Sequence, residues 1–468
     1  MSDVSMPHPR RWAILAVMCL ALVVTGLDTL IVTMAAPSIR TQLHATLGQL
    51  QWVFDAYSLA FAVPILFAGS LADRFGRRRG FLVGMIIFLA GSVFAVLANS
   101  PSTLIAARAI MGLGAAVIMP STLSLIRAVF PPEERARAMG AWVGVASLGV
   151  PLGPVIGGLL LDNFWWGSIF LINVPVIAVA IAGCLILIPE SKNPDHPGLD
   201  YPGLLLSVVG SLLLVDGVIE VPTRGWSSAL TLALIVGGAV ILAGFIAWER
   251  RAPNPMLSHA VFSDRTFGGP MITIASVFFG VFGGLFLVTQ YLQIDLRYRP
   301  LIAGVHMLPM CAVVLVAPQA PKLVQRFGLG PVSMLGPLLV AVSLLILALS
   351  GNPSGTLILI ALAVMGLGIG FGAPPSVDSI LGATPAKQSA AGSAVADVAM
   401  QFGGALGIAL LGSLASTTTT ASKPGTGWAA GAGVVAAGAV AAFAVLPPKP
   451  AEAARRSVSA EKQPLASN

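Results

Sequence analysis

The fold is decided by residues 50–98, which read LQWVFDAYSLAFAVPILFAGSLADRFGRRRGFLVGMIIFLAGSVFAVLA. Two apolar runs of about 20 residues flank a short loop, and each run is long enough for a helix to cross the bilayer core. The loop between them carries one acidic and four basic residues. The pattern predicts two membrane-spanning helices joined by a basic loop.

The composition of the whole chain extends this prediction. Only 10% of its 468 residues are charged and 56% are hydrophobic, with a mean hydropathy of +0.90. Soluble proteins carry about 25% charged residues, so a water-soluble globular fold is excluded. The three cysteines lie in separate apolar runs without paired spacing, so neither a disulfide framework nor a cysteine metal site is expected.

Fourteen apolar runs of spanning length occur along the chain, although the last is rich in glycine and is the weakest. They are Trp12–Ala36, Leu50–Leu71, Gly80–Ala98, Leu104–Ile126, Ala138–Leu161, Trp166–Ile188, Pro202–Val221, Ala229–Trp248, Phe267–Leu292, Ala303–Leu323, Pro331–Leu349, Thr356–Leu381, Gly392–Ala415 and Ala429–Leu446. An all-α polytopic membrane protein is therefore expected, with both termini on one side.

The basic residues support the same topology. With both ends in the cytoplasm, the inner segments hold 20 of the 26 Lys and Arg residues and the outer loops hold 5. Cytoplasmic loops accumulate Lys and Arg, which accounts for the net charge of +7 without any nucleic-acid partner.

A weak internal repeat suggests the organisation of the chain. Residues 68–76 (AGSLADRFG) after the second run are similar to residues 320–328 (APKLVQRFG) after the tenth. We expect a six-helix bundle at 1–188, a loop with two inserted helices at 189–266, a second six-helix bundle at 267–446 and a disordered cytoplasmic tail at 447–468. Repeated halves are typical of transporters, whose substrate sites lie near mid-bilayer between the halves.

Three motifs carry further information. The loop motif contains Gly69, Asp73, Arg74, Gly76, Arg77 and Arg78, and the fifth run contains Gly149, Gly153, Pro154, Gly157 and Gly158. Arg108 is the one arginine inside a run, so it must face a polar cavity or a carboxylate. Glycines permit a tight turn or close helix approach, whereas the loop arginines and Asp73 could build a charge network. The loop charges also have a plain topological explanation, and Arg108 could simply pair with an aspartate to fix two helices.

These motifs resemble those of the Major Facilitator Superfamily, specifically the fourteen-span drug:proton antiporter branch of QacA-like and EmrB-like pumps. Further resemblance lies in Leu27-Asp28-Thr-Leu-Ile-Val-Thr33 and in Trp52-Val-Phe-Asp55-Ala-Tyr57-Ser-Leu, although Leu30 and Thr33 depart from the branch pattern. The resemblance implies a gating role for the loop motif, a proton-relay role for Arg108 and an export-associated antiporter motif in the fifth run.

Carboxylates inside the apolar runs are the expected proton and cation sites. An acid in a low dielectric binds a proton more readily and releases it when an opposing charge arrives. Asp28, Asp55 and Asp397 are ranked first, whereas the lower-ranked residues are Asp216, Asp378, Gln401, Tyr57, Phe282 and Phe286. Asp378 lies near a helix end where solvation or pairing with Lys387 is expected, and the phenylalanines could pack or line a pocket for flat cations.

The expected function is proton-coupled export of amphipathic, often cationic, drugs and antiseptics by alternating access across a bacterial inner membrane. The alternative is a dedicated exporter of an endogenous metabolite or antibiotic with the same fold. Neither a phosphate-binding loop nor a catalytic motif is present, so we expect no enzyme, no catalytic residue, no metal and no cofactor. The expected partners are the transported small molecules, protons and membrane lipids, and the protein is expected to act as a monomer.

Overall fold

The computed structural model describes residues 9–191, 200–253, 255, 265–317, 319–383, 389–416 and 425–445, and every regular element in these ranges is a helix. The helices are α1 (Arg11–Gln42), α2 (Leu47–Ala62), α3 (Ile65–Phe75), α4 (Arg77–Val96), α5 (Pro101–Val129), α6 (Pro132–Asn163), α7 (Ser168–Leu171), α8 (Asn173–Leu187), α9 (Tyr201–Ile219), α10 (Val221–Arg224), α11 (Ala229–Glu249), α13 (Arg265–Gln290), the π-helix η1 (Tyr291–Asp295), α14 (Pro300–His306), the 3₁₀-helix η2 (Leu308–Cys311), α15 (Ala312–Val316), α16 (Ala320–Phe327), α17 (Leu329–Leu349), α18 (Gly355–Ala383), α19 (Ser389–Ser416) and α20 (Gly425–Val445). The tail expected to be disordered at 447–468 lies outside the described residues.

Local sequence explains where several helices begin and end. Thr46 and Ser100 cap α2 and α5 through reciprocal hydrogen bonds with the residues three positions later. Gly76 and Gly328, the last residues of the two similar sequence segments, both have positive φ angles, of 126° and 89°. Each ends one helix and starts the next, so the sequence repeat corresponds to a repeated tight turn that glycine makes without strain.

Eleven of the described helical segments are long and apolar enough to cross a membrane, and the bent pair α2 and α3 raises this number to twelve. The two other runs expected to span correspond to α6 and to the segment 300–327, which are not in this count. The total of fourteen therefore stays a prediction.

Two of the expected spans are sharply bent or divided into several short helices. The run Leu50–Leu71 is bent by 44° between α2 and α3, where Pro64 stands. The run Ala303–Leu323 is divided into α14, η2, α15 and α16. Proline lacks the N–H that continues helical hydrogen bonding, and Pro309 lies within the 3₁₀ turn of this segment.

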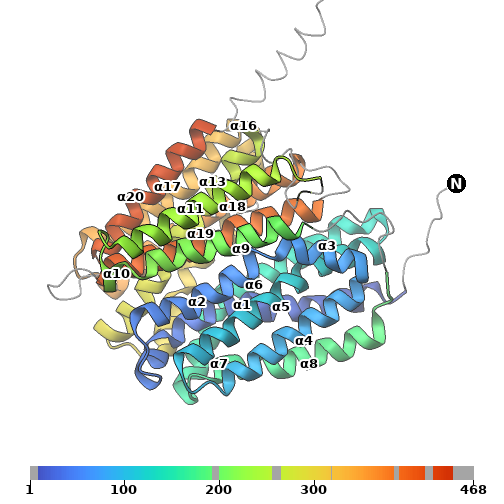
Figure 1. Ribbon diagram of the computed structural model, residues 1–468, viewed down its shortest axis with the longest axis horizontal. Helices are drawn as coiled ribbons and strands as arrows, with labels where there is room; N and C mark the ends of the chain where they lie inside the picture. The colour runs from blue at the N-terminus through green and yellow to red at the C-terminus, as the bar shows by residue number, and fades with distance from the viewer. Residues whose placement is uncertain are drawn as a thin grey trace, which may run out of the picture.

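The helices pack in two sets. Helix α1 contacts α6 and α8, and α5 contacts α2 and α4; α13 contacts α18, α19 and α20, and α17 contacts α18 and α20. The sets meet where α2 contacts α19 and where α6 contacts α14. Helices α9 and α11 pack on each other, and α9 also contacts α2 and α19, along the boundary between the sets (Figure 1).

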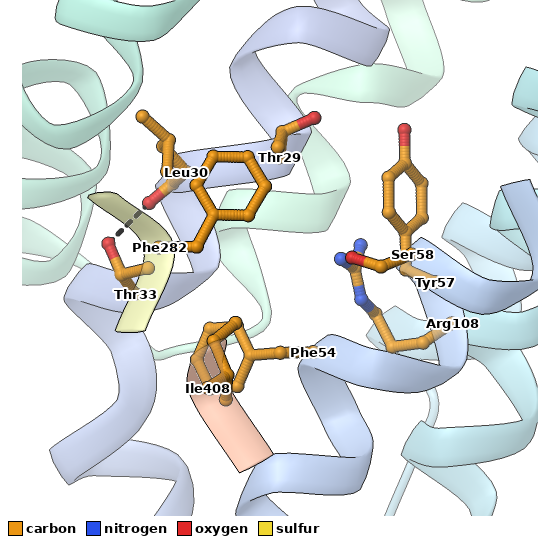
Figure 2. A pocket seen from close by; sticks show the side chains of 9 residues that line it. All are labelled: Thr29, Leu30, Thr33, Phe54, Tyr57, Ser58, Arg108, Phe282 and Ile408. Carbon is orange, nitrogen blue, oxygen red and sulfur yellow. Dashed lines mark hydrogen bonds between the residues drawn. The ribbon is translucent and has the colours of Figure 1, made fainter. Parts of the chain in front are cut away.

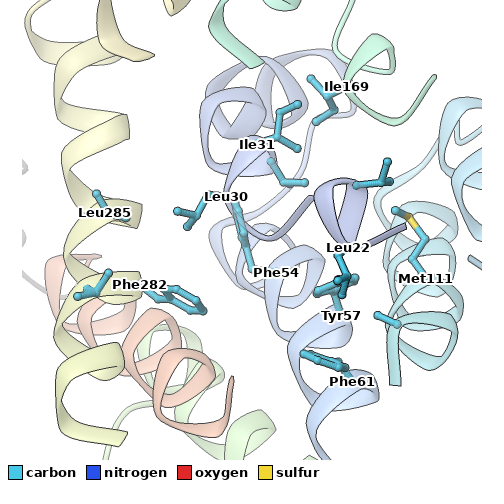
Figure 3. Packing of buried hydrophobic residues seen from close by; sticks show 14 of the residues in the cluster. Leu22, Leu30, Ile31, Phe54, Tyr57, Phe61, Met111, Ile169, Phe282 and Leu285 are labelled. Atoms are coloured by element: carbon cyan, nitrogen blue, oxygen red, sulfur yellow. The ribbon is translucent and has the colours of Figure 1, made fainter. Parts of the chain in front are cut away.

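Apolar side chains fill much of the boundary between the sets. Leu30 of α1 and Phe54 of α2 lie toward Phe282 and Leu285 of α13 (Figure 3), and all four are buried. The buried polar groups described below are therefore held in a low-dielectric interior, where an unpaired charge is costly.

Candidate functional site

A buried ion pair joins α1 to α5. Asp28 and Arg108 have exposed side-chain fractions of 0% and 1%, and Arg108 Nη1 donates to Asp28 Oδ2. An arginine without a counter-charge would be strongly destabilising at this depth, so the pair explains how both residues are tolerated. The structure thus brings together one of the first-ranked acids and the one arginine that lies inside an apolar run.

Further polar contacts orient the pair. Arg108 Nε donates to the carbonyl of Val53 at 3.1 Å, and its guanidinium lies 4.2 Å from the centre of the Tyr57 ring. Asn173 Nδ2 lies 3.4 Å from Asp28 Oδ1. Arg108 is therefore fixed by α1 and α2 together, and any change at Asp28 reaches both helices.

Asn173 is a functional candidate that sequence reasoning missed. It is buried at the start of α8, and its Nδ2 also lies 3.4 Å from Ser92 Oγ on α4. The position of Asn173 inside an apolar run could have indicated it, because a buried amide needs a polar partner just as a buried carboxylate does.

Close helix approach at Gly112 helps to place Arg108. A side chain at Gly112 would collide with the backbone of Tyr57 on α2. The absence of a side chain lets α5 lie directly against α2, so that Arg108 reaches the Val53 carbonyl.

Asp55 is fully buried on α2 but does not join the pair. Neither of its carboxylate oxygens has a hydrogen-bond partner among the described residues. The structure therefore separates Asp55 from the Asp28–Arg108 pair, whereas the sequence had left a common acid–arginine network open.

A small cavity lies against Arg108 at the boundary between the two helix sets (Figure 2). Its lining comes from five helices and consists of Thr29, Leu30, Thr33, Phe54, Tyr57, Ser58, Arg108, Phe282 and Ile408. Arg108 is the one charged residue in this lining. The lining combines aromatic rings with hydroxyl groups. The cavity has a volume of about 10 Å³, enough for about one water molecule, so a drug-sized ligand would fit only after the two helix sets separate.

The predicted phenylalanine stripe on α13 contributes to this region. Phe282 lines the cavity, and its ring packs edge-on against Phe278 with centroids 5.6 Å apart. Phe286 packs edge-on against Phe54 at 5.4 Å, across the boundary. Both candidates thus lie at the boundary, one facing the cavity and one packing behind it.

The glycine motif of α6 has two packing faces. Gly149, Gly153 and Gly157 face α1, where an added Cβ at Gly149 would lie 2.6 Å from the carbonyl carbon of Gly26. Gly158 faces α14, where an added Cβ would lie 2.5 Å from the Pro300 carbonyl oxygen. Small residues therefore let α6 pack closely on both helix sets at once.

Pro154 and its neighbours continue the contact between α6 and α14. A side chain at Gly304 would collide with the backbone of Pro154. Farther along, Arg299 Nη2 forms an ion pair with Asp162 Oδ2 at 3.2 Å, and Gln293 Nε2 donates to the Met34 carbonyl at 3.0 Å. These contacts join α1 and the end of α6 to residues 293–299 of the other set.

The loop motif lies at the opposite ends of the helices. Gly76 makes the turn, Arg78 Nη2 donates to the Leu185 carbonyl at 2.8 Å, and Arg79 lies 3.4 Å from Glu190. The backbone N–H of Arg77 donates to Ser191. These bonds tie the start of α4 to the end of α8 within one helix set.

The other loop-motif residues, Gly69, Asp73 and Arg74, lie in α3. A Cβ added at Gly69 would lie 3.2 Å from Pro120 on α5, and Arg74 lies over the neighbouring Phe75 ring. Asp73 lies in α3, and its side chain is outside what the structure describes. At the same end, Arg11 binds Glu134 at 2.7 Å and lowers the pKa of that carboxyl group.

Asp216, Asp378, Asp397 and Gln401 are not among the residues that contact the Asp28–Arg108 pair. Asp216 accepts a hydrogen bond from Trp52 Nε1 at 3.3 Å, Asp378 is exposed and Asp397 is partly exposed. Gln401 is buried, with neither amide atom hydrogen-bonded among the described residues. The partner expected for Asp378, Lys387, lies outside the described residues.

A helical membrane bundle in two sets, with a buried ion pair and a cavity at their boundary, defines the class of polytopic membrane transporters. A family model described as the Major Facilitator Superfamily matches residues 18–407 and 271–467. The chain belongs to the Major Facilitator Superfamily and is a transporter.

Curated relatives are similar over most of the chain. The multidrug resistance protein Stp of Mycobacterium tuberculosis is 38% identical over 404 residues, covering 84% of this chain and 75% of that protein. The tetracenomycin C resistance and export protein of Streptomyces glaucescens is 35% identical over 408 residues, covering 86% of this chain and 76% of that protein. The methyl viologen resistance protein SmvA of Salmonella typhimurium is 33% identical over 417 residues, covering 88% of this chain and 84% of that protein.

Solved structures share the fold. A POT family transporter in complex with a thioalcohol conjugated peptide superimposes with a TM-score of 0.68, covering 94% of this chain and 98% of that chain. The sequence identity is 14%, so this likeness concerns the fold alone.

Proposed function

We propose that the protein is a proton-coupled exporter of amphipathic, often cationic, small molecules in a bacterial cytoplasmic membrane. The observation that carries the proposal is the buried Asp28–Arg108 pair, whose arginine also lines the cavity between the helix sets. The names of the relatives, among them a multidrug resistance protein and a methyl viologen resistance protein, support drug export.

In the proposed topology, fourteen spans form bundles at 1–188 and 267–446 with the inserted helices between them. The end that carries Gly76 and Gly328 faces the cytoplasm, along with both termini. The contacts of α6 with α14 then lie toward the outer side, and transport requires these contacts to open.

Proton coupling follows from the pair. When Asp28 binds a proton, Arg108 loses its counter-charge in a low-dielectric interior and must find a new partner. Because Arg108 is bonded to both α1 and α2, loss of its counter-charge alters the contacts between these two helices, which line the cavity. Asp55 and Asp397 are proposed as further proton or cation sites, and no cofactor is required, because each inward proton supplies about 2.3 kcal/mol per 100 mV.

Ethidium efflux from loaded proteoliposomes tests this function. We expect wild-type efflux to accelerate when protons are enriched on the side that receives the dye, and to return to the basal rate when an ionophore collapses the gradient. Asp55→Asn is expected to lose the acceleration, since the amide cannot exchange a proton. Equal wild-type rates with and without the gradient would overturn proton coupling.

A substitution at Phe282 tests whether the cavity binds substrate. Phe282→Ala removes an aromatic ring from the lining, and we expect the half-saturating concentration of ethidium to rise by a factor of about 5–30, corresponding to about 1–2 kcal/mol. Phe443→Ala, at a 49% exposed position on α20, is the matched control and should leave it unchanged. An equal effect of both substitutions would contradict this binding site.

A second candidate is a dedicated exporter of an endogenous metabolite or antibiotic. It is favoured by the relative named for tetracenomycin C resistance and export. Deleting the gene and comparing culture supernatants separates the two functions. Loss of one secreted compound with unchanged dye resistance would favour the dedicated exporter.

A further inference from the structure

The inserted helix α9 is bonded to both helix sets. Trp52 Nε1 of α2 donates to Asp216 Oδ1 at 3.3 Å, and Ser413 Oγ of α19 donates to the carbonyl of Val218 at 3.0 Å. Helix α9 therefore lies along the α2–α19 seam rather than only beside α11 (Figure 1).

Apolar packing continues this three-helix contact. A separate buried cluster combines Leu59 of α2 with residues of α9 and α19, namely Val215, Val218, Ile219, Ala405 and Ala409. Trp52 packs against the same cluster. Helix α9 thus covers the face of α2 that contains Trp52 and Leu59.

Asp55 lies on this covered face. Residues three or four positions apart share a helix face, so Asp55 lies between Trp52 and Leu59. It also follows Gln51 by four residues, and Gln51 Nε2 donates to the carbonyls of Ile408 and Ala409 on α19. With α19 on one side and α9 on the other, the Asp55 carboxyl group is 0% exposed and has no hydrogen-bond partner among the described residues.

Among the described residues, no charged group on the neighbouring helices forms an ion pair with Asp55. Arg108 of α5 binds Asp28 of α1 and contacts the opposite face of α2, at Val53 and Tyr57. On the two covering helices and at the C-terminal end of α9, the structure describes three acidic groups. Asp216 accepts a hydrogen bond from Trp52, and Glu220 forms an ion pair with Arg224 at 2.8 Å. The third, Asp397, is partly exposed. The isolation of Asp55 therefore depends on the helices that cover it.

We propose that α9 is the lid of a sealed chamber around Asp55, and that the Trp52–Asp216 hydrogen bond positions this lid. Asp216 acts as a positioning residue, because its acceptor oxygen holds α9 on α2. The role of the chamber in transport rests on the proposed function. The burial of Asp55 beneath α9 does not depend on what the protein transports. Opening the α2–α19 seam during transport would then break the Ser413 contact and expose Asp55.

Carbodiimide labelling measures the seal directly. Dicyclohexylcarbodiimide is lipophilic and adds to protonated carboxyl groups, so its rate of reaction at Asp55, followed by peptide mass spectrometry, reports access to the chamber. The reaction uses the full-length protein in proteoliposomes without substrate or gradient. Labelling of the partly exposed Asp397 in the same sample is the internal reference.

Asp216→Leu and Trp52→Phe each remove the hydrogen bond. We expect Asp55 to be labelled about three- to tenfold faster in both variants, the change that loss of one part-buried hydrogen bond makes in a local opening equilibrium. Asp216→Asn should label at the wild-type rate, because the amide oxygen still accepts from Trp52 Nε1. Glu220→Gln is the matched control on the same helix and should also keep the wild-type rate.

Three results would overturn the lid. They are unchanged labelling in both Asp216→Leu and Trp52→Phe, equal acceleration in Asp216→Asn and Asp216→Leu, or equal acceleration at Asp397. If Asp216→Leu fails to fold, Trp52→Phe alone decides the outcome. Absence of gradient-driven efflux in the wild type would overturn the proposed function without changing these labelling ratios, so the two failures are distinguishable.

Discussion

Asp28→Asn is expected to abolish gradient-driven efflux of ethidium and to destabilise the protein. The substitution leaves the Arg108 guanidinium buried without its counter-charge, and breaking a buried pair in this way costs about 3–5 kcal/mol. The amide also cannot exchange a proton. Efflux from loaded proteoliposomes and thermal unfolding in detergent measure the two effects.

The double variant Asp28→Asn/Arg108→Gln separates folding from coupling. We expect it to unfold at a higher temperature than Asp28→Asn alone, because no uncompensated charge remains, yet to show no gradient-driven efflux. Glu133→Gln, at an exposed acid on α6, is the control and should behave as wild type in both assays. If Asp28→Asn loses stability but keeps coupled efflux, the pair only fixes two helices.

Gly158→Val is expected to block transport by preventing closure of the α6–α14 interface. An added Cβ would lie 2.5 Å from the Pro300 carbonyl oxygen and 2.7 Å from Leu301 Cα, so backbone has to move. Overpacking of this kind costs about 1–3 kcal/mol. It shifts the balance between the closed and open states of this interface by a factor of about 5–150.

The effect of Gly158→Val is measured as efflux rate and as the reactivity of a cysteine introduced at Thr33 toward a membrane-impermeant thiol reagent added outside. We expect efflux to fall and labelling to rise together. Gly140→Val is the matched control on the same helix, because a Cβ at Gly140 has no neighbour within 4 Å. Normal efflux in Gly158→Val would show that this contact is not part of the transport cycle.

The prediction of the membrane fold from sequence was successful because a bilayer imposes a strong one-dimensional constraint. A helix must be apolar for about 20 residues to cross it, so runs such as Gly80–Ala98 predicted the helices at these positions. Where proline interrupts a run, as near Pro64 and Pro309, composition stays apolar while the helix bends or breaks. Hydropathy therefore predicts a span without predicting its continuity.

For the candidate site, the sequence determined which residues were exceptional, and the tertiary structure decided which of them meet. Asp28 and Arg108 are costly inside a membrane, so each had to have a partner or a polar cavity, and this was readable from their positions. That Arg108 binds Asp28 and not Asp55 depends on the rotation of α2, which turns Val53 toward α5 and Asp55 away from it. The position of α9 over Asp55 likewise depends on packing between helices far apart in the chain, and hydropathy along one helix carries no information about its neighbours.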